Sequence, residues 1–280
     1  MSDNRHNYER PPIGINSLPF WFAGGGSVED SLPVVAELGF ASVEIWTDHL
    51  WWTGEDPARL APKLESYGLR STVHCPAWEV NFTSPNRGIR EESLRQVFES
   101  IEHAQALGAD LLVVHPGRLG GPVLSQERFW ELQLEAWDRL VAHADRCDVV
   151  LTAENMETSS KRHVVKTAED IHRIVEHFPP GKLGVTFDTS HMGDTEGCLK
   201  FIAAGLDEIT HVHLSDTETL PSGAVRYHLP LGEGQIDFQR VLDALLPGYR
   251  GVLSLETRIP NADRNLMLAQ LRFLDKLLSS

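Results

Sequence analysis

The stretch GVTFDTSH, residues 184–191, closes an apolar run with Asp188 and places His191 three positions later. A buried strand needs neither residue for its own stability, and burying a carboxylate is costly unless a partner compensates its charge. A backbone cap, a cation or a metal ion could be that partner. The segment alone does not decide between them, so the rest of the chain must.

Titratable residues also stand near the ends of most other apolar, β-branched runs of the chain. Chance would not concentrate polar residues there, because these runs are otherwise the most apolar segments. Seven of the eight runs carry such residues: Glu44, His74, His115, Glu154, Asp188, His211 with His213, and Glu256. We therefore predict that many of these side chains meet in one site.

Carboxylates that converge in one site repel one another unless a cation neutralises them. Glu154, Asp188 and Glu256 bring three negative charges, and His213 adds a neutral imidazole. A mixed set of oxygen and nitrogen ligands suits Mn²⁺, Mg²⁺, Zn²⁺ or Co²⁺. Asp188 is therefore predicted to be a metal ligand, with His191 as a second-sphere group or a ligand of a further metal.

The elements that would position these residues follow from an alternation of patterns. We predict strands over residues 13–17, 41–46, 69–74, 110–117, 149–155, 183–189, 209–216 and 251–257. We predict helices over the amphipathic stretches 28–38, 57–67, 90–107, 125–147, 167–177, 196–204, 237–246 and 262–278. Eight such units in one chain predict a single-domain (β/α)8 TIM barrel, whose active face holds the strand ends. An open doubly wound sheet is the alternative, but no GxGxxG motif follows the first strand.

Composition narrows the class of protein. The chain has 280 residues and a net charge of −15, which argues against a protein whose main task is to grip nucleic acid. Apolar runs stay below the roughly 20 residues that span a bilayer, so we expect no membrane partner. Three widely spaced cysteines fit a reducing compartment, and we expect a cytoplasmic protein. Residues 1–12 are interpreted as a flexible tail, and residues 13–280 as the barrel.

The motifs STVHCP, LLVVHPG, LTAEN, VTFDTSH, THVHLSD, HLPLGEGQIDF and LSLET follow one another along the chain. In this order they make it resemble the xylose isomerase-like TIM barrel superfamily, which holds sugar isomerases, sugar epimerases and DNA repair enzymes of the endonuclease IV type. The resemblance covers nearly the whole chain. Its isomerase and epimerase branch implies one divalent metal ion bound by Glu154, Asp188, His213 and Glu256. It also implies that Glu154 and Glu256 act as acid and base around an enediolate.

The repair branch of the superfamily implies three zinc ions and therefore more ligands. His74, His115, His191 and His228 match its additional histidines. That branch has an aspartate two residues before the last of them, where this chain has Arg226, a poor neighbour for a third metal. Arg226 would instead suit an oxygen, carboxylate or phosphate of a substrate. This departure and the acidic charge favour a sugar-like substrate, with the zinc phosphodiesterase as the alternative.

For several residues the sequence leaves two interpretations open. His74, His115, His191 and His228 could line a substrate pocket, and His74 and His115 could instead be capped structural histidines. Trp46 and Trp78 could wall a sugar ring or pack the barrel rim, and Glu157 could bind a hydroxyl group or lie exposed. On the seventh strand we place His213 in the site by the resemblance, and we expect His211 to face the opposite way.

The first hypothesis is therefore a metal-dependent isomerase or epimerase acting on a ketose-like or polyol substrate. The second is a zinc phosphodiesterase, and a lyase or dehydratase could use the same residues. A third hypothesis is a barrel that binds a ligand without catalysing a reaction. The presence of both glutamates argues against it, because binding alone needs no acid and base pair. Barrels of this kind often pair, so a homodimer is expected.

Overall fold

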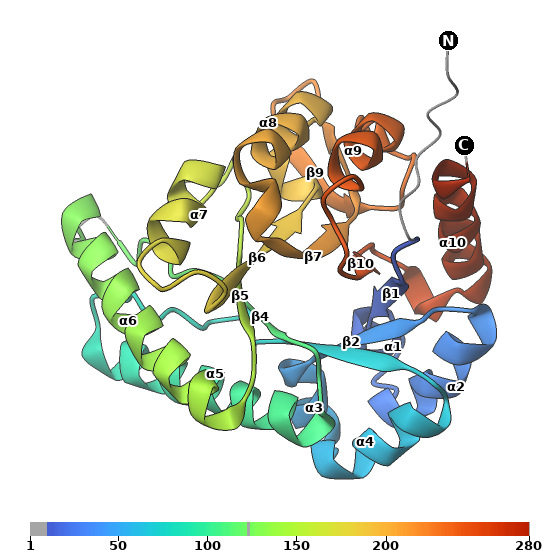
Figure 1. Ribbon diagram of the computed structural model, residues 1–280, viewed down its shortest axis with the longest axis horizontal. Coiled ribbons are helices and arrows are strands. Elements are labelled where there is room, and N and C mark those ends of the chain that lie inside the picture. The colour runs from blue at the N-terminus through green and yellow to red at the C-terminus, as the bar shows by residue number, and fades with distance from the viewer. Residues whose placement is uncertain (1–9, 122–123, 280) are drawn as a thin grey trace.

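The computed structural model describes residues 10–121 and 124–279 (Figure 1). At its centre, eight parallel strands close into a barrel in the order β1-β10-β7-β6-β5-β4-β3-β2. They are β1 (Ile13–Asn16), β2 (Ser42–Trp46), β3 (Arg70–His74), β4 (Leu112–Val114), β5 (Leu151–Glu154), β6 (Leu183–Asp188), β7 (Ile209–Leu214) and β10 (Leu253–Leu255). Each lies within a predicted strand, which confirms the single-domain (β/α)8 barrel.

The predicted helices are also present and surround the barrel (Figure 1). They are α2 (Val28–Leu38), α4 (Pro57–Ser66), α5 (Arg87–Leu107), α6 (Gln126–Cys147), α7 (Ala168–Val175), α8 (Thr195–Gly205), α9 (Phe238–Leu245) and α10 (Arg264–Leu278). Most begin at a side chain that accepts a hydrogen bond from a backbone N–H of the first turn. These N-caps are Ser27, Asp56, Asn86, Ser125, Thr167, Asp237 and Asp263.

The periodicity did not predict the short elements around the mouth of the barrel. Helices α1 (Leu18–Phe22) and α3 (Thr47–Thr53) follow the first two strands, and an antiparallel hairpin joins β8 (Asp216–Thr219) to β9 (Val225–Leu229). Two single turns, Ser190–Met192 and Pro260–Ala262, complete the set, and a third, Leu206–Glu208, leads into the amino end of β7 on the opposite side. These elements are too short to show a hydrophobic period, yet those at the mouth shape the space above the strand ends.

The barrel interior carries polar side chains where many barrels carry branched aliphatic ones. On β2, Val43 and Ile45 belong to the hydrophobic core, while Glu44 between them accepts a hydrogen bond from Thr72 at 3.1 Å. The hydroxyl groups of Thr152 and Thr186, on β5 and β6, hydrogen bond to each other at 2.6 Å. Strand alternation therefore sends the aliphatic residues toward the helices and leaves a buried polar layer inside.

Residues 1–9 of the expected tail lie outside the described part of the chain, while Arg10 forms an ion pair with Asp275 of α10. Among the described residues, no helix combines the length and the apolar character that are needed to cross a bilayer.

Asp216 fixes the loop that leads from the hairpin into α9. The carboxylate is fully buried, and each of its oxygens accepts two hydrogen bonds from backbone N–H groups. The donors, at 2.8 to 3.1 Å, are Thr217, Gly232, Gly234 and Ile236. Such a set of donors requires an acceptor at both positions of the side chain, because the amide nitrogen of an asparagine would meet two N–H groups head-on.

We expect Asp216→Asn to lower the free energy of unfolding by about 2 to 4 kcal/mol, since two buried charge-assisted hydrogen bonds would be lost. Urea denaturation followed by circular dichroism measures this change. Glu233→Gln, an exposed substitution in the same loop, serves as the control and should change stability by less than about 0.5 kcal/mol. Equal stability of both variants would mean that other contacts hold the loop.

Candidate metal centre

Four side chains converge at the carboxyl ends of four neighbouring strands, β5, β6, β7 and β10. Glu154 and Asp188 end their strands, His213 pairs in register with Asp188, and Glu256 follows β10 directly. One ligand atom of each lies within 4.8 Å of those of the others. All four residues are buried, and Glu256 is the most accessible at 6%. The structure thus brings together the four residues that the family resemblance implies as metal ligands.

The buried oxygens of this cluster fit a bound cation. Within residues 10–121 and 124–279, Glu154 Oε2, Asp188 Oδ2 and Glu256 Oε2 accept no hydrogen bond of regular geometry, although imidazole nitrogens lie 3.0 Å from Glu154 Oε2 and 2.7 Å from Glu256 Oε2. Three buried carboxylates with so few donors are costly, and a divalent ion would compensate their charge. Three oxygen ligands and one imidazole nitrogen form a set that Mn²⁺, Mg²⁺, Co²⁺ and Zn²⁺ all accept.

The charges of the cluster show the same need for a cation. Burial and the neighbouring carboxylates Glu256 and Glu154 raise the pKa of Asp188, although His191 acts against them. Burial also acts to raise the pKa of Glu256, but His213 outweighs it and the pKa falls to about 2. Burial lowers the pKa of His213, yet the surrounding carboxylates raise it well above its ordinary value. Without a metal, the cluster therefore relies on a protonated imidazole.

The predicted additional histidines form two groups beside the central one. His74 and His115 face Glu154 Oε2, with their Nε2 atoms 3.4 Å and 3.0 Å away. His191 and His228 lie beside Asp188, and one ligand atom of each of the three residues lies within 4.8 Å of those of the others. Each group shares one carboxylate with the central four, so the donor set could hold further cations. His228 also adopts a left-handed backbone with φ of 57°, which is strained for a non-glycine residue.

A cavity of about 590 Å³ lies over the cluster. His115, His191, His228 and Glu256 line it, so the candidate ligands are within reach of a bound molecule. His74 is fully buried and does not line it, because the ring of Trp46 stacks on the His74 ring at 3.8 Å.

Aromatic side chains form one wall of this cavity. Trp46 and Trp78 line it as predicted, and Phe22 of the unpredicted helix α1 joins them. The rings of Trp46 and Trp78 lie 5.3 Å apart, and those of Phe22 and Trp78 lie 6.1 Å apart. Phe22 is 63% exposed and Trp78 48% exposed, so this wall continues from the site to the surface. Flat apolar surfaces of this kind stack against the carbon face of a ring.

The structure does not bring Arg226 to the cavity. Its side chain is exposed on β9 and pairs with Glu218 of β8 at 2.8 Å, because neighbouring strands of the hairpin place the two side by side. Glu157 does line the cavity, but its carboxylate lies 2.5 Å from His163.

Sequence reasoning missed the two arginines that do line the cavity. Arg118 follows β4 and Arg258 follows β10, each within four residues of the strand end. Reading a few residues past each strand end, into the loops of the active face, would have found both.

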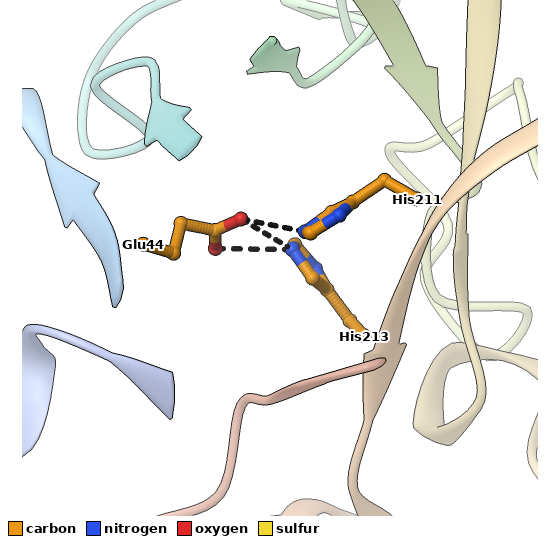
Figure 2. Close-up of side chains that lie close together, drawn as sticks. All are labelled: Glu44, His211 and His213. Carbon is orange, nitrogen blue, oxygen red and sulfur yellow. Dashed lines mark hydrogen bonds and ion pairs between the residues drawn. The ribbon is translucent and has the colours of Figure 1, made fainter. Parts of the chain in front are cut away.

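Glu44 and His211 are the other residues that sequence reasoning left outside the site. Figure 2 shows that Glu44 faces both His211 and His213. The expectation that His211 points away was wrong, because residues two apart on a strand share a face. His211 Nε2 donates a hydrogen bond to Glu44 Oε2 at 2.8 Å, and His213 two residues later belongs to the cluster of four candidate ligands.

Comparisons with known proteins agree with this fold. A family model described as "Xylose isomerase-like TIM barrel" matches residues 32–277. A solved structure titled "Crystal structure of D-tagatose 3-epimerase-like protein" is 26% identical, with a TM-score of 0.77, over 96% of this chain and 97% of that one.

Curated relatives carry two different activities in their names. An "Inosose dehydratase" of Geobacillus thermodenitrificans is 28% identical over 91% of this chain and 91% of its own length. A "Probable endonuclease 4" of Aquifex aeolicus is 24% identical over 75% of this chain and 78% of its own length.

Proposed function

The chain belongs to the xylose isomerase-like TIM barrel family, and from that premise we propose that it is a divalent-metal-dependent isomerase or epimerase of a sugar-like substrate. The observation that carries the proposal is the cluster of Glu154, Asp188, His213 and Glu256 beside the cavity. Two of its members are glutamates at the ends of strands that are not neighbours, Glu154 on β5 and Glu256 directly after β10. A substrate carbon held between them would have a carboxylate on each side.

The two glutamates can exchange protons with such a carbon. Burial alone would raise the pKa of Glu154, but His115 and His213 lower it overall, and Glu256 is lowered as well. Both groups are therefore ionised at neutral pH, so either can accept a proton from a carbon next to a carbonyl. The other glutamate, or a bound water, returns a proton to the same or the adjacent carbon. When bound, the cation supplies Lewis acidity to the carbonyl and its neighbouring hydroxyl.

The cavity supports a small polyol rather than a polymer as the substrate. Its volume of about 590 Å³ is in the range of small-molecule sites. Trp46 and Trp78 would cover one face of a sugar ring, while Arg118 and Arg258 would donate hydrogen bonds to its oxygens. The net charge of −15 opposes the approach of a polyanion.

Two other reactions have an observation in their favour. A dehydratase also begins by removing a proton next to a carbonyl, and a relative named inosose dehydratase aligns over 91% of this chain. A zinc phosphodiesterase would use the two clusters beside the central one, which could hold further cations. One is formed by His74 and His115 with Glu154, and the other by His191 and His228 with Asp188.

The test is deuterium exchange in D₂O with a panel of ketoses, aldoses and cyclic polyol ketones, at saturating Mn²⁺, Mg²⁺, Co²⁺ or Zn²⁺. We expect one substrate to gain deuterium next to its carbonyl and to turn into an isomer or epimer, as NMR would show. A product that contains one water molecule less than its substrate would make the protein a dehydratase. Cleavage of an abasic DNA duplex, with no exchange in any sugar, would replace the proposal by the phosphodiesterase.

A further inference from the structure

Glu44 is a buried carboxylate to which the proposed reaction gives no task. It lies on β2 and is 1% exposed, below the cluster of metal ligands. Strands β1 and β10 separate β2 from β7, so Glu44 reaches across the barrel interior to the histidines of β7. Figure 2 shows its carboxylate aimed at both His211 and His213. A buried carboxylate needs hydrogen-bond donors, and the identity of these donors indicates the role of Glu44.

Three side chains donate to this carboxylate. Glu44 Oε2 accepts hydrogen bonds from Thr72 Oγ1 at 3.1 Å and from His211 Nε2 at 2.8 Å. His213 Nε2 lies 3.0 Å from Oε1 and donates to Oε2 at 3.2 Å. An ionised carboxylate can only accept hydrogen bonds, so the ring nitrogens that face it must carry protons. Glu44 therefore selects the state of His213 in which Nε2 is protonated.

The other nitrogen of the same ring faces the metal ligands. His213 Nδ1 lies 2.7 Å from Glu256 Oε2 and 3.3 Å from Glu154 Oε1. A neutral imidazole has one N–H, so protonation at Nε2 leaves the lone pair of Nδ1 free for a cation. We propose that Glu44 is a positioning residue, which fixes the tautomer and the ring orientation of His213 so that Nδ1 binds the metal. The inference goes beyond the proposed reaction, since it holds for any metal chemistry at this centre.

His211 has a supporting part in this arrangement. Its ring is fully buried and stands at 85° to that of His213, with the ring centres 5.1 Å apart. By donating to Oε2 it holds the Glu44 carboxylate in place from a second side. The contacts of 2.8 to 3.2 Å around Glu44 are ordinary hydrogen-bond lengths, and Thr72 adds a donor that a cation could not replace. These contacts favour a hydrogen-bonded support over a second metal site.

The test compares metal affinity in the full-length wild type and in Glu44→Gln, by competition with a chelating dye at fixed pH, using Co²⁺ and Zn²⁺. We expect 10- to 100-fold weaker binding in the variant, the usual cost of removing a carboxylate behind a ligating histidine. The visible spectrum of bound Co²⁺ should also change. Thr152→Val is the matched control, because it removes a buried hydroxyl of the same interior layer that bonds to Thr186 instead. Its affinity should stay within about twofold of wild type.

A second readout does not depend on affinity. Proton–nitrogen correlation spectra of the Zn²⁺-loaded, ¹⁵N-histidine-labelled protein, with His213 assigned by its absence in His213→Asn, should show Nε2–H with metal on Nδ1. Metal on Nε2, or equal affinity of Glu44→Gln and wild type, would overturn the inference and leave the proposed function standing. Two bound ions, one of them lost in His211→Asn, would also overturn it by making Glu44 a ligand. A wild type that binds no divalent metal would overturn the proposed function itself.

Discussion

Replacing Glu154 or Glu256 by glutamine is expected to reduce turnover by about 10²- to 10⁴-fold, because an amide cannot take or return a proton. Each residue is also expected to bind the cation, so a modest loss of metal affinity should accompany the loss of turnover. Glutamine has nearly the same volume as glutamate, so the packing around both buried positions stays filled. The barrel should therefore remain folded, with an unchanged circular dichroism spectrum.

The two variants can be separated by isotope exchange with the best substrate of the panel. If one glutamate serves as base in a given direction, its variant loses deuterium exchange and turnover together. The variant of the other glutamate should retain some exchange while losing net conversion. Glu131→Gln is the control, since Glu131 is exposed on α6, pairs with Arg128 and does not line the cavity. Near-normal turnover of Glu154→Gln or Glu256→Gln would rule out the pair as acid and base.

The order of strands and helices could be predicted because the chain repeats a strong pattern. Buried parallel strands are short, continuous apolar runs, and the outer helices show an apolar stripe and a capping residue such as Ser27 or Asp263. Because the strands are parallel, their carboxyl ends all lie at the same end of the barrel. Glu154, Asp188 and Glu256 could therefore be assigned to one site without knowledge of any distance.

What could not be predicted depends on contacts across the barrel and on short loops. Glu44 lies 167 positions before His211 in sequence, and only the closed barrel makes them neighbours. The hairpin of β8 and β9 holds Arg226 beside Glu218, and no periodicity marks so short an element. Phe22 lines the cavity from α1, which follows the carboxyl end of β1, and the five residues of this helix are too few for a helical signal.

Removing the metal is expected to lower the melting temperature as well as to abolish turnover. A cation present at about 100 times its dissociation constant stabilises the folded protein by about 2.7 kcal/mol. For a chain of this size, that corresponds to a fall of about 5 °C after treatment with a chelator. The physical cause is the mutual repulsion of the buried carboxylates Glu154, Asp188 and Glu256, which would lose the cation that compensates their charge. Differential scanning fluorimetry with and without chelator measures the shift, and returning the metal should restore it.

The fall should grow as the pH rises, because protonated histidines replace part of the missing charge. Burial lowers the pKa of His191, but Asp188 and Glu154 outweigh it and raise the pKa to about 9 from its ordinary value of 6.5. The pKa of His213 is raised as well.

A group whose pKa is raised in the folded state stabilises the fold fully below its unfolded pKa. It loses that contribution as the pH rises through its folded pKa. The metal-free protein should therefore lose stability between about pH 6.5 and 9. Protons also compete with the metal at the acidic end of this range, which acts in the same sense. A difference between metal-loaded and metal-free melting temperatures that stays constant over this range would mean that the carboxylates are not compensated by these histidines.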